Sequence, residues 1–92
     1  MNKFSTQVVY ITKDTPIFRD NLTIGYHFIN SGNCNIYINN VLLLPGNNWK
    51  TFEANMIDLT LYRAKFTSST SANASCAAAN ANLTLIIYSN AN

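Results

Sequence analysis

Regular alternation of apolar and polar side chains is the feature that most constrains this chain. Within residues 34–39, Cys34, Ile36 and Ile38 alternate with polar neighbours, which is the period of a β-strand with one buried and one solvated face. Three other stretches show the same period: residues 22–28, 57–62 and 83–88. All are rich in β-branched or aromatic residues, which suit a pleated, half-buried surface. Further strands are predicted at residues 6–11, 41–44 and 49–53.

Turn-forming residues separate these stretches. Ser31-Gly32-Asn33 follows one predicted strand, and Asn39-Asn40 is suited to a two-residue hairpin turn because Asn tolerates positive φ. Pro45-Gly46-Asn47-Asn48 is the strongest turn signal, so two consecutive hairpins are predicted. The expected fold is an all-β, small antiparallel β-sandwich, Ig-like or jelly-roll-like, of about seven strands. A turn of helix is an alternative only at residues 50–56.

The length of 92 residues is that of one compact domain, so residues 1–92 are expected to form a single sandwich. Large apolar side chains disappear between residues 67 and 82, where the chain is Ala-, Ser- and Asn-rich. Such a segment cannot contribute to a core and is longer than most loops. We therefore predict a flexible loop there, with packing against another subunit as the alternative.

Composition favours contacts with proteins. Hydrophobic residues make up 48% and charged residues only 11%, so the polar surface consists mainly of Asn, Ser and Thr and provides little charge repulsion between copies. The six basic residues are scattered and the net charge is +2, which argues against a nucleic-acid partner. No apolar run after Met1 has the length of a signal peptide or membrane span. A cytoplasmic origin then predicts that Cys34 and Cys76 stay reduced.

No set of residues predicts catalysis. His27 has no acid or cysteine nearby in the chain to orient it, so a structural role is expected. The four acids, Asp14, Asp20, Glu53 and Asp58, show no spacing that suggests paired carboxylates. Nucleotide, nucleophile and zinc motifs are absent. The sequence therefore predicts neither enzyme activity nor a cofactor or metal.

Aromatic residues are the first candidates for contacts with partners. Trp49 can anchor an interface or close one end of the core. Tyr37, Tyr62 and Tyr88 each fall on the polar phase of a predicted strand, so all three are predicted to face outward.

The order of turns and strands resembles that of small virion proteins of tailed bacteriophages. The resemblance is carried by Asn30-Ser31-Gly32, by residues 36–47 with their Pro-Gly turn, and by residues 57–66, and it covers roughly residues 20–90. It looks like the "N-x-G, strand, short turn, strand, Pro-Gly, strand" modules of auxiliary capsid, head-fibre and fibre-adaptor proteins. Asn40 stands where many such modules carry Gly. The Asn-rich, Lys-poor surface resembles that of phages of gut Bacteroidota, including crAss-like phages.

This resemblance implies a decoration or joining role on the virion. The expected partner is the major capsid protein or a fibre-base protein, bound by many copies or a homo-oligomer of this chain, on a capsid surface or head-fibre base assembled in the host cytoplasm. Phe4 in the N-terminal arm, and Ser71 and Asn73 in the segment at residues 67–82, are expected to touch neighbouring subunits.

Two rival functions remain open at this stage. A glycan- or receptor-binding module of a phage fibre would use Trp49 and Asn side chains. A single-stranded nucleic-acid binder would stack bases on Tyr62 and Phe66 beside Arg63 and Lys65.

Overall fold

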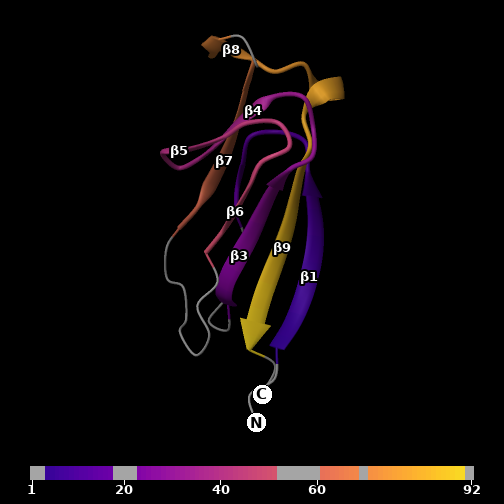
Figure 1. Cartoon of the computed structure of the whole chain (residues 1–92), viewed down its shortest axis with the longest axis vertical. Helices are drawn as coiled ribbons and strands as arrows, with labels where there is room; N and C mark the ends of the chain where they lie inside the picture. Colours follow the sequence, from indigo (N-terminus) through magenta and orange to yellow (C-terminus); the bar gives the residue numbers. More distant parts are fainter. Residues whose placement is uncertain (1–3, 18–22, 52–60, 69–70, 91–92) are drawn as a thin grey trace.

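The computed structural model describes residues 4–17, 23–51, 61–68 and 71–90, which form two antiparallel sheets packed face to face (Figure 1). The predicted all-β sandwich is therefore confirmed. The four-stranded sheet has the order β1 (Phe4–Ile11), β9 (Leu83–Asn90), β3 (Thr23–Asn30), β6 (Asn48–Lys50). The five-stranded sheet has the order β2 (Thr15–Pro16), β7 (Arg63–Ser68), β4 (Asn35–Ile38), β5 (Val41–Leu43), and β8 (Ser71–Ser75) also pairs with β7.

The core lies between the sheets and follows the predicted alternation. In β9 the odd-numbered residues from Leu83 to Ile87 point inward, and in β4 Ile36 and Ile38 do so. Tyr26 and Phe28 of β3, the strand that pairs with β9, are fully buried as well. Burying one such side chain contributes about 1.5–3 kcal/mol to stability. Burial of these inward-facing side chains therefore holds the two sheets together.

Of the strand predicted at residues 57–62, only Leu61 and Tyr62 lie within the described residues, and neither belongs to a strand. Leu61 is 75% exposed, Tyr62 is buried, and β7 begins only at Arg63. The prediction had Tyr62 facing outward. Its ring instead packs edge-on against Tyr26 and Phe28, with centroids 5.3 and 5.4 Å away. These two rings of β3 provide the apolar contact that turns Tyr62, and not Leu61, toward the core.

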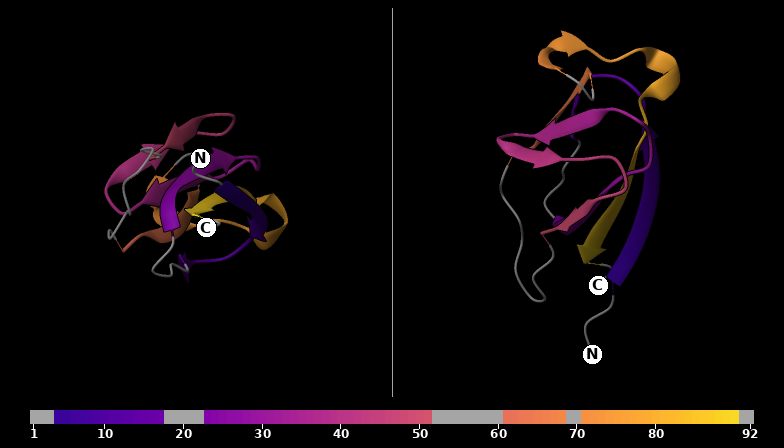
Figure 2. Two further views of the ribbon diagram at one scale, coloured as in Figure 1. Left: turned by 90° about the horizontal axis from the view of Figure 1, so that it is seen from below. Right: turned by 45° about the horizontal axis from the view of Figure 1, so that its top comes forward.

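Of the two predicted hairpins, the first is confirmed and the second is wrong, because the second turn joins strands that do not pair with each other. Asn39 adopts a φ of 55° between β4 and β5, where Ile38 pairs with Val41, so the first hairpin is confirmed. At the second turn Gly46 has a φ of 85° and the Asn47 N–H donates to the Leu44 carbonyl over 2.9 Å. Proline followed by a positive-φ glycine is typical of a type II turn. The strands it connects lie in different sheets (Figure 2), because β5 pairs with β4 and β6 pairs with β3.

The remaining predicted strands have counterparts: β1, β3, β4, β5 and β9 occupy the expected places, and β6 begins one residue before the strand predicted at residues 49–53. The short strands β2 and β8 are additional to the prediction, and so is β7, because no strand was predicted at residues 63–68. The alternative helical turn at residues 50–56 falls mostly outside the described residues, and Lys50 belongs to β6.

The segment at residues 67–82 is more regular than predicted. It contains the end of β7, all of β8, and the short 3-10 helix η1 (Ala78–Asn80), and Ala81 is buried. Backbone hydrogen bonds require no side-chain volume, so small residues can form a strand. The prediction that this segment cannot contribute to the core is wrong, because Ala81 belongs to the core and Cys76 packs against it. The predicted flexibility of this segment stays a prediction.

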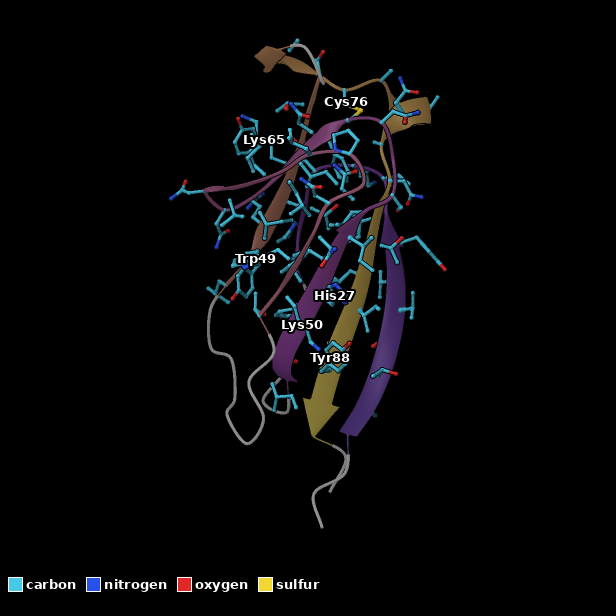
Figure 3. All side chains as sticks on the ribbon, viewed as in Figure 1. His27, Trp49, Lys50, Lys65, Cys76 and Tyr88 are labelled. Atoms are coloured by element: carbon cyan, nitrogen blue, oxygen red, sulfur yellow. A yellow bond between two sulfur atoms is a disulfide. The ribbon has the colours of Figure 1, made fainter. Side chains whose placement is uncertain are left out.

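The prediction of two reduced cysteines is wrong. Cys34, just before β4, and Cys76, just after β8, form a disulfide with their Cα atoms 6.0 Å apart, within the usual range for such bonds. Figure 3 shows the sulfur atom of Cys76 beside the turn that precedes β4. A separation of 42 residues hid this proximity in the sequence.

The turn between β3 and β4 lies directly against the start of β9. The Ser31 N–H donates to the Asn82 carbonyl over 3.1 Å, and the Asn33 N–H donates to the Asn80 carbonyl over 2.8 Å. Asn30, at the end of β3, is fully buried: its side-chain amide donates to the carbonyls of Cys34 and Leu43 over 2.7 and 2.9 Å. Its Oδ1 accepts from the Gly32 N–H over 3.2 Å. The asparagine thus holds β3, β4 and β5 together at one end of the sandwich.

Gly32 shows how closely these two segments approach. A Cβ at this position would lie 2.4 Å from the Asn80 carbonyl oxygen and 2.7 Å from the Asn82 nitrogen. Both are backbone atoms, and the residues that carry them are held against the turn, since the carbonyls of Asn80 and Asn82 accept hydrogen bonds from it. Only glycine fits there, and the reason is space, because Gly32 does not need a positive φ.

Replacing Gly32 with alanine is therefore expected to destabilise the protein by about 2–3 kcal/mol, the cost of forcing an extra carbon into a packed site. Gly46→Ala serves as the comparison, because nothing lies within 4 Å of a Cβ at Gly46 and only its positive φ opposes the change, at about 1 kcal/mol. Urea unfolding of both variants measures the difference. Equal losses would contradict the proposed close contact.

Candidate protein-binding surface

The outer face of the four-stranded sheet is the best candidate for a binding surface. Strand pairing places its residues in two rows of four and one shorter row. One row holds Val8, Ile86, His27 and Lys50, and the next holds Tyr10, Thr84, Ile29 and Asn48. The shorter row holds Thr6, Tyr88 and Gly25. We call these eleven residues the β1–β6 face, and none of them carries a carboxylate.

Apolar side chains on this face are exposed mainly at β1. Val8 is 51% exposed and Tyr10 is 69% exposed, and both belong to the edge strand. Two further apolar residues of the face, Ile86 on β9 and Ile29 on β3, are half-buried. Exposed apolar side chains that adjoin one another on a sheet indicate a contact surface more strongly than isolated ones do.

The opposite side of the β1–β6 face is held by polar contacts. The Lys50 ammonium lies 5.5 Å from the centre of the Tyr88 ring, a cation–π distance, and Figure 3 shows the two side chains next to one another below His27. The His27 ring nitrogen Nε2 lies 3.0 Å from Asn48 Oδ1. The ring of His27 thus links β3 to β6, and its predicted structural role stays a prediction. Tyr88 faces outward as predicted, although it is half-buried beneath Lys50.

Trp49 closes one side of the core and leaves part of its ring accessible. It sits on β6 opposite Phe28, with the rings stacked at a centroid distance of 5.7 Å, and Tyr62 approaches it edge-on at 5.9 Å. The residue is half-buried. Of the two roles predicted for Trp49, the structure places it in the core-closing one, and this leaves less of the ring free to stack on a sugar.

The outer face of the five-stranded sheet carries two basic side chains, Arg63 and Lys65, together with the exposed Leu42. Tyr37 of β4 lies between Lys65 of β7 and Leu42 of β5, and it is half-buried and faces outward as predicted. Arg63 and Lys65 are exposed, whereas Tyr62 and Phe66 point into the core. The aromatic and basic side chains proposed for base stacking therefore point to opposite sides of the chain at residues 62–66. They do not form the binding surface that the nucleic-acid hypothesis requires.

The other predicted contact residues are placed only in part. Phe4 begins β1 and pairs with Asn90, and Ser71 and Asn73 lie in β8. Their contacts with neighbouring subunits stay predictions. Sequence reasoning missed Val8 and Tyr10. The available signal was that residues 8–11 are apolar on both phases of the strand, more than one buried face requires.

Only one of the four acids, Asp14, lies within the described residues. Asp14 accepts a hydrogen bond from the Phe66 N–H over 2.9 Å and so ties the connection between β1 and β2 to β7. Asp20, Glu53 and Asp58 lie outside the described residues. Across the part of the chain that the structure describes, no three His, Cys, Asp or Glu side chains come together where they could hold a metal ion.

Comparison with known proteins adds no assignment: no protein-family model, no curated protein and no solved structure matches the chain. Among the described residues there is also no helix of the length and hydrophobicity needed to cross a membrane. The surfaces themselves therefore carry the functional argument.

Proposed function

We propose that this protein is an auxiliary structural protein of a virion, which decorates a capsid lattice or joins a head fibre to it. In this proposal the β1–β6 face, with Val8 and Tyr10 at its exposed end, docks on the major capsid protein or a fibre-base protein. The observation that carries the proposal is the exposure of these two side chains on a face that has no carboxylate.

Physical chemistry favours docking through this face. An interface gains free energy where apolar and aromatic side chains leave water, and its core is usually poor in charged residues. Val8, Tyr10 and Ile86 offer such a centre, and Asn48 and Thr84 offer hydrogen-bonding groups around it. The tyrosine is suited to the role because its ring buries a large area while its hydroxyl can still hydrogen-bond.

The disulfide fits the same role. Disulfides persist in oxidising surroundings, which include the surface of virions outside the cell. A chain of 92 residues buries a smaller share of its surface than a larger domain does, and the bond between Cys34 and Cys76 compensates for this. A protein of a released particle has to stay folded without a cell to replace it, so a cross-link is useful there.

Particle incorporation tests the proposal. The chain is co-expressed with its neighbouring genes, particles are purified on a density gradient, and the copy number per particle is measured by quantitative mass spectrometry. We expect the wild-type protein in the particle band, and Tyr10→Asp to lower its copy number at least tenfold, because a carboxylate would be buried in an apolar contact.

Leu61→Asp is the matched control, since Leu61 is equally exposed but lies outside the β1–β6 face. It is expected to leave the copy number unchanged. Absence of the wild-type protein from the particles would overturn the proposed function. Equal incorporation of the two variants would overturn the choice of face.

A further inference from the structure

The outer edge of β1 is a long strand edge that no other described element covers. Among the described residues β1 pairs only with β9, through eight consecutive pairs from Phe4–Asn90 to Ile11–Leu83 without a bulge. Figure 1 shows β1 at the border of its sheet, with no element beyond it. A strand of this length spans about 26 Å. Alternate N–H and C=O groups along its outer side are therefore free to pair with another strand.

Most of the other described edges are short or blocked, and β8, which pairs only with β7, has five residues against the eight of β1. At the far side of the same sheet β6 has three residues, one of them Lys50. In the five-stranded sheet β5 has three residues, and β2 has two, one of which is Pro16. Short strands, lysine and proline are the usual means by which proteins prevent edge pairing. β1 has none of these, since its sequence Phe-Ser-Thr-Gln-Val-Val-Tyr-Ile contains no charge and no proline.

We propose that the β1 strands of two copies of this protein pair edge to edge, antiparallel, around a two-fold axis at Val8. The two four-stranded sheets then form one continuous sheet. The observations favour a second copy as the partner, because two uncharged β1 strands do not repel each other. The same edge of β1 can accept a strand from another copy and supply one to it, so one surface serves both partners.

The register follows from the faces of the sheet. In a continuous sheet the outward residues of both copies, Thr6, Val8 and Tyr10, must lie on the same side, so each outward residue pairs with another outward residue. Centring the axis on Val8 places Val8 opposite Val8 and Tyr10 opposite Thr6 of the second copy. Pairs of β-branched and aromatic residues stabilise antiparallel strands. The β1–β6 faces of the two copies then become one surface with four exposed apolar side chains at its centre.

An edge joint of this kind is weak on its own. Pairing one strand with another buries less area than the roughly 1,200–2,000 Å² of a stable interface, so we expect a dimer that dissociates on dilution. Copies held close together on one scaffold would pair more readily, because their effective concentration is high. The inference goes beyond the proposed function, since it concerns the contact between copies and applies whatever surface they occupy.

Charge replacement at Val8 tests the axis. Sedimentation velocity of the isolated, oxidised protein over a wide concentration range should show a monomer–dimer equilibrium. We expect Val8→Lys alone, and Val8→Glu alone, to weaken dimerisation at least tenfold, because each places like charges directly opposite each other. An equimolar mixture of the two variants should form the mixed dimer, since Lys then faces Glu. Val8 is half exposed, so both variants are expected to fold, which circular dichroism checks.

Leu61→Lys is the control for added charge and is expected to dimerise as the wild type does. A wild-type protein that stays monomeric at all concentrations would overturn the inference. So would a dimer that is unaffected by Val8→Lys, or variants whose mixture is no better than either alone. These measurements use no particles, so they fail or succeed separately from the incorporation experiment.

Discussion

Removing the disulfide with the double substitution Cys34→Ala/Cys76→Ala is expected to lower the free energy of unfolding by about 4 kcal/mol. The cross-link closes a loop of 42 residues, and a loop of that length restricts the unfolded chain by about this free energy. For a domain of this size the loss corresponds to a fall in melting temperature of roughly 20 °C. Urea and thermal unfolding, followed by circular dichroism, measure both quantities.

Reduction of the wild-type protein provides the control. Adding a thiol reductant should lower the stability of the wild type to that of the variant, and should leave the variant unchanged, because the variant has no bond to lose. A variant that unfolds at the same urea concentration as the oxidised wild type would show that the cross-link does not constrain the chain.

Asn30→Ala is expected to cost about 3 kcal/mol. The Asn30 amide is fully buried and donates to the carbonyls of Cys34 and Leu43, while its oxygen accepts from the Gly32 N–H. Alanine leaves these three backbone groups without partners, and each buried orphan costs about 1–3 kcal/mol, offset in part where water can enter. Urea unfolding measures the loss.

Asn33→Ala is the matched control, because Asn33 lies in the same turn with its side chain exposed, and it should change stability by less than about 0.5 kcal/mol. Amide hydrogen exchange gives a second measurement. Loss of the Asn30 amide should raise the exchange rate of the Gly32 N–H more than the rates of amides in the middle of β9, because the turn opens before the strand does. Equal stability of the two alanine variants would contradict the role assigned to Asn30.

Local pattern determined much of this fold in advance. Two-residue periodicity correctly placed β4 and β9, because a strand with one buried face must alternate apolar and polar residues whatever it pairs with. The turn at Asn39 and the conformation of Gly46 were also predictable, since the tolerance of Asn and Gly for positive φ is a property of the residue itself.

The choice of partner for each strand could not be predicted in this way. The Pro45-Gly46 turn reverses the chain in either case, but only the packed structure places β5 and β6 in different sheets. The orientation of Tyr62 depends on rings from β3 that lie far away in the sequence. Likewise, the exposure of Val8 and Tyr10 follows from the position of β1 at an edge, where one face receives no covering layer.

The sequence by itself determined the two-layer β architecture, the positions of most strands and the low charge of the surface, because these depend on each residue and its near neighbours. Only the tertiary structure decided that Cys34 and Cys76 meet, that the buried Asn30 amide joins three strands, and that β1 lies at the border of its sheet. All three depend on distances between segments that are remote along the chain. Such distances are fixed when the sheets pack together, and no local pattern records them.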